Sequence, residues 1–146
     1  MRLIVGTDSD IGRAVKTHWD TNNTVYHAST RNKDSSNSVR PHIDLTKDIT
    51  LNDQLNYDVA VLCAGITRLE LCRKDPEGTR KINVDGTLRL ARYLSERGTY
   101  VIFLSTDKVY DGSRKYRSPD DNISPITEYG RQKAEVEEFI ENYLNV

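Results

Sequence analysis

Short apolar runs recur along the chain, and each is followed by a turn or a longer amphipathic stretch. Buried strands of a parallel sheet are nearly continuous in apolar residues, and the fourth and fifth runs have this character. The pattern predicts five strands, at residues 2–5, 24–28, 42–45, 58–63 and 100–104.

Apolar residues at helical spacing predict helices between these strands. Ile11, Ala14, Val15 and Trp19 indicate a helix after the first strand, and another helix is expected to begin near Thr46. Residues 69–80 predict a loop and a short helix that contains Pro76, and a longer helix follows from Ile82 with a stripe of Val84, Leu88, Ala91 and Ser95.

The last predicted helix covers residues 128–144. Its expected apolar face consists of Val136, Phe139, Ile140, Tyr143 and Leu144, and its glutamates Glu135, Glu137, Glu138 and Glu141 are expected to form a solvated face. A long loop at 108–126 precedes it, and loops of this length often serve a functional site.

The alternation of strands and helices predicts an α/β fold with a parallel sheet. We expect one Rossmann-type domain over residues 1–146, doubly wound, with strand order 3-2-1-4-5 and ending after the last helix. No internal repeat or linker divides the chain.

The composition and charge of the chain argue against several classes of function. The net charge of −1 gives no electrostatic case for nucleic acid or an acidic membrane, and the basic stretch 114–117 is interpreted as a solvated loop. Cys63 and Cys72 lack metal-ligand company and are expected to be free thiols, which suits a reducing cytoplasm. The three histidines share no motif, so no metal site is expected.

The first turn, residues 6–12, has the composition of an anion site. A helix that opens directly after a strand directs free backbone N–H groups and its positive dipole end at a bound anion, and a pyrophosphate suits such a site. Gly6 and Gly12 occupy the outer positions of a Gly-x-x-Gly-x-x-Gly pattern, but Ser9 stands at the middle position. A plain structural turn is the alternative.

Three further positions fit a dinucleotide. Arg31 follows the second strand, where an acid would bind a ribose 2′-hydroxyl and an arginine a 2′-phosphate. NADP is therefore favoured over NAD, unless Arg31 is simply a loop residue. Asp44 is suited either to accept from an adenine amino group or to cap a helix. Ala64 and Gly65 are small enough for a flat ligand to lie on the backbone.

A tyrosine and a lysine stand one helical turn apart at Tyr129 and Lys133. A tyrosine holds its proton up to about pH 10, and a neighbouring ammonium lowers that pKa. The pair is therefore interpreted as proton-transfer machinery or as part of an ordinary amphipathic helix. Ser105 and Thr106 lie at the tip of the fifth predicted strand, where open α/β sheets place their chemistry.

Together these motifs resemble the extended short-chain dehydrogenase/reductase family, and most closely its dTDP-4-dehydrorhamnose reductases and related nucleotide-sugar reductases and epimerases. The most specific motifs are Ser-Thr-Asp-x-Val-Tyr-Asp-Gly and Tyr-Gly-x-x-Lys. The resemblance covers the whole chain and rests on residues 6–12, 44–45, 63–65, 82–87, 104–112 and 129–133.

The resemblance implies a role for each matching residue. Tyr129 would act as the general acid, Lys133 would bind the nicotinamide ribose and tune Tyr129, and Thr106 would bond the substrate oxygen. Asn83 would order its helix and relay waters. The cofactor, NADP(H) by preference with NAD(H) as the alternative, would contact Gly6, Ser9, Asp10, Ile11, Gly12, Arg31, Asp44, Leu45, Cys63, Ala64, Gly65, Ser105, Tyr129 and Lys133.

Members of this family normally continue beyond the Tyr-x-x-x-Lys helix into a lobe that binds the nucleotide sugar. Residues 1–146 end after that helix, so one sheet edge is expected to be uncovered. Two hypotheses follow: a short nucleotide-sugar oxidoreductase, or a non-catalytic module that binds a dinucleotide or a partner. A homo-oligomer or a partner chain would cover the edge. A structural fold without a ligand is the third alternative.

Overall fold

The computed structural model describes residues 1–52 and 55–143, and a four-stranded parallel sheet forms its centre. The strands are β1 (Arg2–Val5), β2 (Tyr26–Ala28), β3 (Val59–Leu62) and β4 (Tyr100–Phe103). Their order across the sheet is β2-β1-β3-β4, with Ile4 opposite both Ala28 and Val61. The prediction of an α/β fold with a parallel sheet is confirmed.

The predicted third strand is wrong, and with it the order 3-2-1-4-5. Residues 42–45 contribute a single parallel bridge, in which His42 pairs with Thr30 beyond the end of β2. Pro41 has no N–H to donate, and the carboxylate of Asp44 accepts from the backbone N–H of Thr46 at 2.9 Å. The chain therefore turns away after one bridge, on the side of β2 where the third strand was expected.

The main helices are α1 (Asp10–Thr21), α2 (Leu69–Lys74), α3 (Pro76–Arg80), α4 (Thr87–Ser95) and α5 (Glu128–Tyr143). Short 3-10 turns lie at Lys33–Ser35 and Asp107–Val109. The helix expected near Thr46 is absent from the described residues, because Asp44 closes a turn there instead of capping a helix. Leu144 of the expected α5 face lies outside the described residues.

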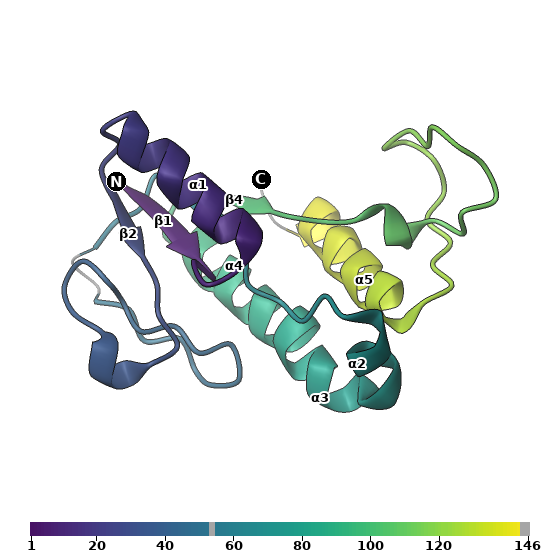
Figure 1. The fold of residues 1–146 in the computed structure, drawn as a ribbon, viewed down its shortest axis with the longest axis horizontal. Helices are drawn as coiled ribbons and strands as arrows, with labels where there is room; N and C mark the ends of the chain where they lie inside the picture. The colour runs from purple at the N-terminus through teal and green to yellow at the C-terminus, as the bar shows by residue number, and fades with distance from the viewer. Residues whose placement is uncertain (53–54, 144–146) are drawn as a thin grey trace.

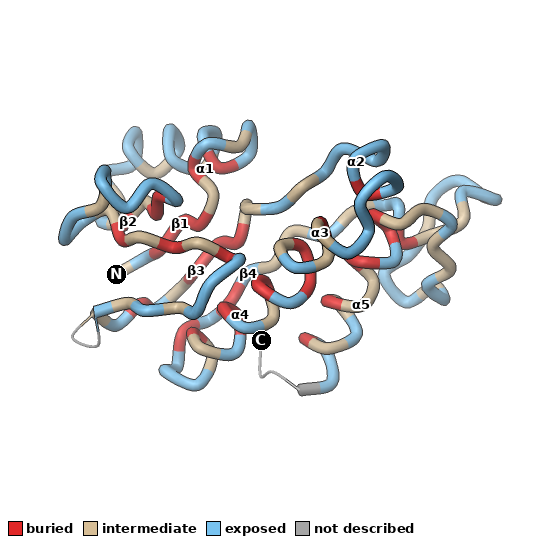
Figure 2. The backbone as a smooth tube through the Cα atoms, turned by 90° about the horizontal axis from the view of Figure 1, so that it is seen from below, coloured by how far each residue is buried: buried red, intermediate tan, exposed pale blue. Residues whose placement is uncertain are grey.

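The sheet lies between two helical layers, with α1 on one face and α4 on the other (Figure 1). Residues of β1, β3 and β4 that point toward α4 form the main core, together with Leu90, Ala91 and Leu94. Figure 2 shows the buried backbone concentrated along these strands and along α4. This core thereby holds the carboxyl ends of the strands side by side.

A π-helical segment, η2 (Lys81–Gly86), joins α3 to α4. Arg80, Lys81, Gly86 and Thr87 all have helical backbone angles, so the helix runs on through the widened turn. The hydroxyl of Thr87 donates to the Ile82 carbonyl, five residues earlier, at 3.0 Å. Such widened turns are frequent at functional sites, and Asn83 lies within this one.

Helix α5 packs against η2 and the loop after β4. Thr127 caps its first turn by accepting from the Gly130 N–H at 3.0 Å. A Cβ on Gly130 would lie 2.1 Å from the Lys108 carbonyl oxygen, so only glycine permits this approach. The expectation that Glu135 is merely solvated is wrong, because its carboxylate forms a two-pronged ion pair with Arg80 of α3.

Strand β4 lies at one end of the sheet, and its outward positions are exposed. Tyr100 is 54% and Ile102 38% exposed, on the face opposite the α4-facing Val101. Within the described part of the chain, no strand pairs with the outer edge of β4. Over the same residues, no helix has the length and apolar character needed to cross a membrane.

The core position of Leu94 yields a stability prediction. Leu94 is 1% exposed on α4, so Leu94→Ala removes packed atoms and leaves a cavity, at a cost of about 2–5 kcal/mol. Leu71→Ala on α2, where the side chain is 45% exposed, is the control and changes stability by about 0.5 kcal/mol or less. Urea unfolding measures both, and equal losses would contradict this core assignment.

Candidate functional site

A cleft of about 300 Å³ lies at the carboxyl ends of β1, β2 and β3. Eight predicted cofactor residues line it: Gly6, Ser9, Arg31, Asp44, Leu45, Cys63, Ala64 and Gly65. Parallel α/β sheets bind their ligands at this end of the strands. The structure therefore brings together most of the nucleotide-binding residues expected from the sequence.

The Gly6 turn forms the floor of the cleft through close backbone contact. Gly6 has φ +89°, and a Cβ there would lie 2.5 Å from the Ala64 backbone nitrogen. A Cβ on Gly12 would lie 2.2 Å from the Gly6 carbonyl oxygen. Both outer positions of the glycine pattern therefore require glycine.

Ser9 fits the middle position of the glycine pattern without strain. Its φ of −76° suits any L-residue, and its hydroxyl donates to the Gly6 carbonyl at 2.8 Å. The same oxygen accepts from the Gly12 N–H at 3.0 Å, so Ser9 is the N-cap of α1. Serine in place of glycine at this position preserves the turn, but its hydroxyl engages the Gly12 N–H, which an anion would otherwise use.

Two N–H groups of the first turn of α1 remain directed out of the helix, those of Asp10 and Ile11. They have no intrahelical acceptor, and no partner for them occurs among the described residues. The guanidinium of Arg13 bonds the Asp10 carboxylate and the Asp8 carbonyl, the latter at 2.6 Å. This cation offsets the acidic side chains beside the turn, which would otherwise repel an anion.

Arg31 and Asp44 line the far side of the cleft from the Gly6 turn. Arg31 is exposed, and Asp44 is partly buried. Hydrogen bonds from Thr46 lower the pKa of Asp44, which keeps it a carboxylate at neutral pH. Ser29, which was not predicted, also lines the cleft, and its hydroxyl lies 3.4 Å from the Gly6 nitrogen. Its position at the tip of β2 was the available indication.

Tyr129 and Lys133 lie outside this cleft, on the inner side of α5. Both are buried, and the Lys133 ammonium lies 5.9 Å from the centre of the Tyr129 ring. The ammonium donates to the Leu104 carbonyl at 2.7 Å and lies 4.3 Å from the centre of the Phe103 ring. The predicted pair is thus brought together at the end of β4.

The acid–base properties of this pair differ from the expectation. Burial raises the pKa of Tyr129, whereas a neighbouring ammonium was expected to lower it. The physical reason is that Lys133 directs its ammonium to Leu104, and no partner of the Tyr129 hydroxyl occurs among the described residues. Burial lowers the pKa of Lys133 to about 8.

Cys63 lies between the residues that line the cleft and the Tyr129–Lys133 pair. Its side chain lines the cleft, and burial raises its pKa to about 11 while the charge of Lys133 acts in the opposite direction. Cys63 follows β3, and Leu104, whose carbonyl accepts from the Lys133 ammonium, follows the neighbouring strand β4.

Thr106 and Ser105 follow β4 as predicted. The Thr106 hydroxyl lies 3.3 Å from the Lys108 N–H, for which it acts as N-cap of a 3-10 turn, and 3.3 Å from the Asp107 carboxylate. It must give up the bond that it donates to Asp107 before it can donate to a substrate oxygen. Ser105 is exposed at the strand tip and does not line the cleft.

Asn83 is neither a terminal cap nor free. Its Oδ1 accepts from the Ile66 N–H at 2.7 Å, and its Nδ2 donates to the Ile66 carbonyl at 2.9 Å. Nδ2 also donates to the Gln132 side chain at 2.8 Å. Gln132 was not predicted, although a polar residue four positions before Val136 on the buried stripe of α5 was a usable signal.

The fold and the position of the cleft place this chain in the class of Rossmann-type α/β proteins. Within the described residues, no cluster of three or more His, Cys, Asp and Glu side chains could hold a metal ion. The family described as RmlD substrate binding domain matches residues 1–145, and the chain belongs to that family.

Three comparisons illustrate the relationship. Methionine adenosyltransferase 2 subunit beta from Bos taurus is 30% identical over 149 residues, which cover 97% of this chain and 43% of that protein. A dTDP-4-dehydrorhamnose reductase from Clostridium acetobutylicum superposes with a TM-score of 0.81 at 26% identity, over 97% of this chain and 49% of that chain.

The third comparison is MoeE5 in complex with UDP-glucose and NAD. It superposes with a TM-score of 0.79 at 25% identity, over 94% of this chain and 46% of that chain. This chain therefore spans about half the length of the proteins that it matches. The expected resemblance to nucleotide-sugar reductases and epimerases is confirmed.

The double role of the Ser9 hydroxyl can be tested by stability. Ser9→Ala removes the cap of α1 and its bond to Gly6, and the expected cost is about 1 kcal/mol. Ser38→Ala in an exposed loop is the control, with an expected change below about 0.5 kcal/mol. Thermal unfolding with circular dichroism measures both, and an unchanged Ser9→Ala protein would reject the capping role.

Proposed function

We propose that this chain binds NADP(H) and forms the cofactor-binding part of a nucleotide-sugar oxidoreductase. The observation that carries the proposal is that both groups of residues lie along the same end of the sheet. The cleft lies at the ends of β1, β2 and β3, and the Tyr129–Lys133 pair lies outside it, at the end of the neighbouring strand β4. A dinucleotide is long enough to need both regions.

The residues present fit such a cofactor. The Gly6 turn leaves no room for a Cβ, and the N–H groups of Asp10 and Ile11 point outward at the positive end of α1. Together these features suit a pyrophosphate. Arg31 at the cleft rim supports NADP over NAD, because a guanidinium binds a phosphate through paired, charge-assisted hydrogen bonds.

Tyr129 and Lys133 would supply the chemistry of proton transfer. A nicotinamide, when bound, supplies a hydride. Tyr129 would hold a proton for the substrate oxygen, and its raised pKa keeps that proton in place at neutral pH. Lys133 would move from the Leu104 carbonyl to the ribose, and its charge would then act on Tyr129. Thr106 would bond the same substrate oxygen.

Cofactor preference can be tested by calorimetry. We expect NADPH to bind more tightly than NADH, and Arg31→Ala to weaken NADPH binding by about 10- to 100-fold through loss of a charge-assisted contact. NADH binding is expected to change little, because it has no 2′-phosphate. Isothermal titration of both proteins with both cofactors measures these affinities.

Asn32→Ala is the matched control for this prediction, since Asn32 is the exposed neighbour of Arg31 and its side chain caps a separate turn. Its NADPH affinity should equal that of the unaltered protein. Absence of NADPH and NADH binding at millimolar concentration would reject dinucleotide binding. Equal losses for the two cofactors in Arg31→Ala would reject the 2′-phosphate contact.

The proton donor can be tested separately from cofactor binding. Tyr129→Phe removes only the hydroxyl, so any NADPH oxidation that depends on a nucleotide-4-ketosugar should fall by a factor of about 100 or more. NADPH affinity should stay within about twofold, since the ring keeps its packing. Turnover that survived the substitution would exclude Tyr129 as the donor.

A non-catalytic module is the second candidate, and a specific observation favours it. One relative that matches 97% of this chain is named as the beta subunit of methionine adenosyltransferase 2, so a partner chain belongs to that relative's function. Strand β4, the last strand of the described sheet, with its exposed face residues Tyr100 and Ile102, would be the contact surface for a partner or a second copy. This candidate predicts NADPH binding without turnover on nucleotide-4-ketosugars.

The two free cysteines favour a reducing compartment such as the cytoplasm for either candidate. Sedimentation separates the candidates further. A strictly monomeric protein with turnover supports the oxidoreductase, whereas a stable complex or dimer without turnover supports the module.

A further inference from the structure

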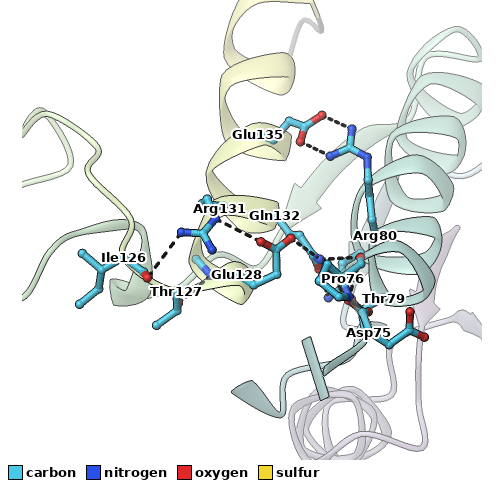
Figure 3. A network of polar contacts seen from close by, with 12 residues as sticks. Asp75, Pro76, Thr79, Arg80, Ile126, Thr127, Glu128, Arg131, Gln132 and Glu135 are labelled. Carbon is cyan, nitrogen blue, oxygen red and sulfur yellow. Dashed lines mark hydrogen bonds and ion pairs between the residues drawn. The ribbon is translucent and has the colours of Figure 1, made fainter. Parts of the chain in front are cut away.

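Gln132 is a buried side chain with several hydrogen-bond partners near the proposed chemistry. It is 1% exposed and lies on the inner side of α5. Its Oε1 accepts from Asn83 at 2.8 Å. Its Nε2 lies 3.0 Å from the Thr79 hydroxyl, 3.0 Å from Glu128 and 3.2 Å from the Pro76 carbonyl (Figure 3). Both N–H bonds of the amide therefore have acceptors, and its oxygen accepts one hydrogen bond.

The network continues from Gln132 to the wall of the cleft. Asn83 bonds Gln132 with the same amide nitrogen that donates to the Ile66 carbonyl, and Ile66 lines the cleft. An unbroken chain of hydrogen bonds thus runs from the cleft wall through the π-helical segment to α5. Each member is buried or partly buried, so water does not readily replace a lost partner.

Because of the position of Gln132 on α5, this network can fix the orientation of the helix. Gln132 comes one turn after Tyr129 and immediately before Lys133. Farther along the helix, Val136 and Ile140 hold α5 by apolar packing against Val84. In the first two turns the amide network takes the place of that packing and fixes the rotation of the helix about its axis.

We propose that Gln132 is a positioning residue, which holds Tyr129 and Lys133 toward the end of β4 and couples them, through Asn83, to the wall of the cleft. The coupling to the cleft rests on the dinucleotide binding proposed above, whereas the positioning of Lys133 does not. Because coupling between sites is reciprocal, occupancy of the cleft should also stabilise α5.

The first experiment measures the titration of Lys133 without any cofactor. In protein labelled with ¹³C-lysine, the Lys133 Cε signal, identified by its loss in Lys133→Met, should titrate near pH 8. In Gln132→Leu the helix loosens and water reaches the ammonium. The midpoint should then move up toward the ordinary lysine value of about 10.4.

The matched control is Glu135→Gln, which removes the charge of another polar contact between α5 and α3, the ion pair of Glu135 with Arg80 (Figure 3). Its Lys133 midpoint should stay near that of the unaltered protein. Gln132→Met, which is longer and more flexible than leucine, replaces Gln132→Leu if that variant does not fold. A midpoint unchanged in a folded Gln132 variant, or moved equally in Glu135→Gln, overturns the proposal.

The second experiment measures amide hydrogen exchange with and without NADPH. In the unaltered protein, NADPH should slow exchange in residues 6–12 and also in α5. In Gln132→Met the slowing should persist at residues 6–12 but be lost in α5. Equal slowing of α5 in both proteins would overturn the coupling. If NADPH slows no exchange anywhere, dinucleotide binding fails, and the lysine titration still decides the positioning role.

Discussion

The close approach of two backbone segments at the end of the sheet is the constraint on which this structure depends. Gly6 bends the chain out of β1 directly against Ala64, and the Gly6 carbonyl leaves no room for a side chain at Gly12. Helix α1 therefore begins on top of the strand end, with its N-terminus directed at the cleft. The position of the candidate anion site and the presence of Ser9 as a cap both follow from this contact.

The central sheet and its main helices could be predicted because their apolar patterns are long and regular. The errors occurred where a single polar residue outweighs the pattern. Asp44 captures the Thr46 N–H and thereby removes both the third strand and the helix expected after it. Likewise, Glu135 lies in a run of glutamates that looks uniformly solvated, but Arg80 from a distant segment binds it. The periodicity of apolar residues along the chain predicts neither of these contacts.

The residues of the candidate site were predicted more completely than the hydrogen bonds that they form. Motifs place residues at strand tips, and the fold brings those tips together, so most of the cleft could be foreseen. The hydrogen-bond partners of these residues depend on three-dimensional distances, which the sequence motifs do not give. The Lys133 ammonium points to Leu104 and the Thr106 hydroxyl to its own turn. The Thr106 hydroxyl has one donor, which Asp107 accepts, so it must change partner before it can donate to a substrate, whereas Lys133 has further N–H donors.

The π-helical segment explains how one continuous helix serves two different layers. Before it, α3 presents Thr79 and Arg80 to α5, and after it, α4 presents Leu90 and Leu94 to the sheet. A regular helix would carry its faces onward at a constant 100° per residue, whereas the widened turn resets that phase at Asn83. The chain thus contains a built-in phase shift, and a residue inserted or removed there would turn one half of the helix away from its neighbours.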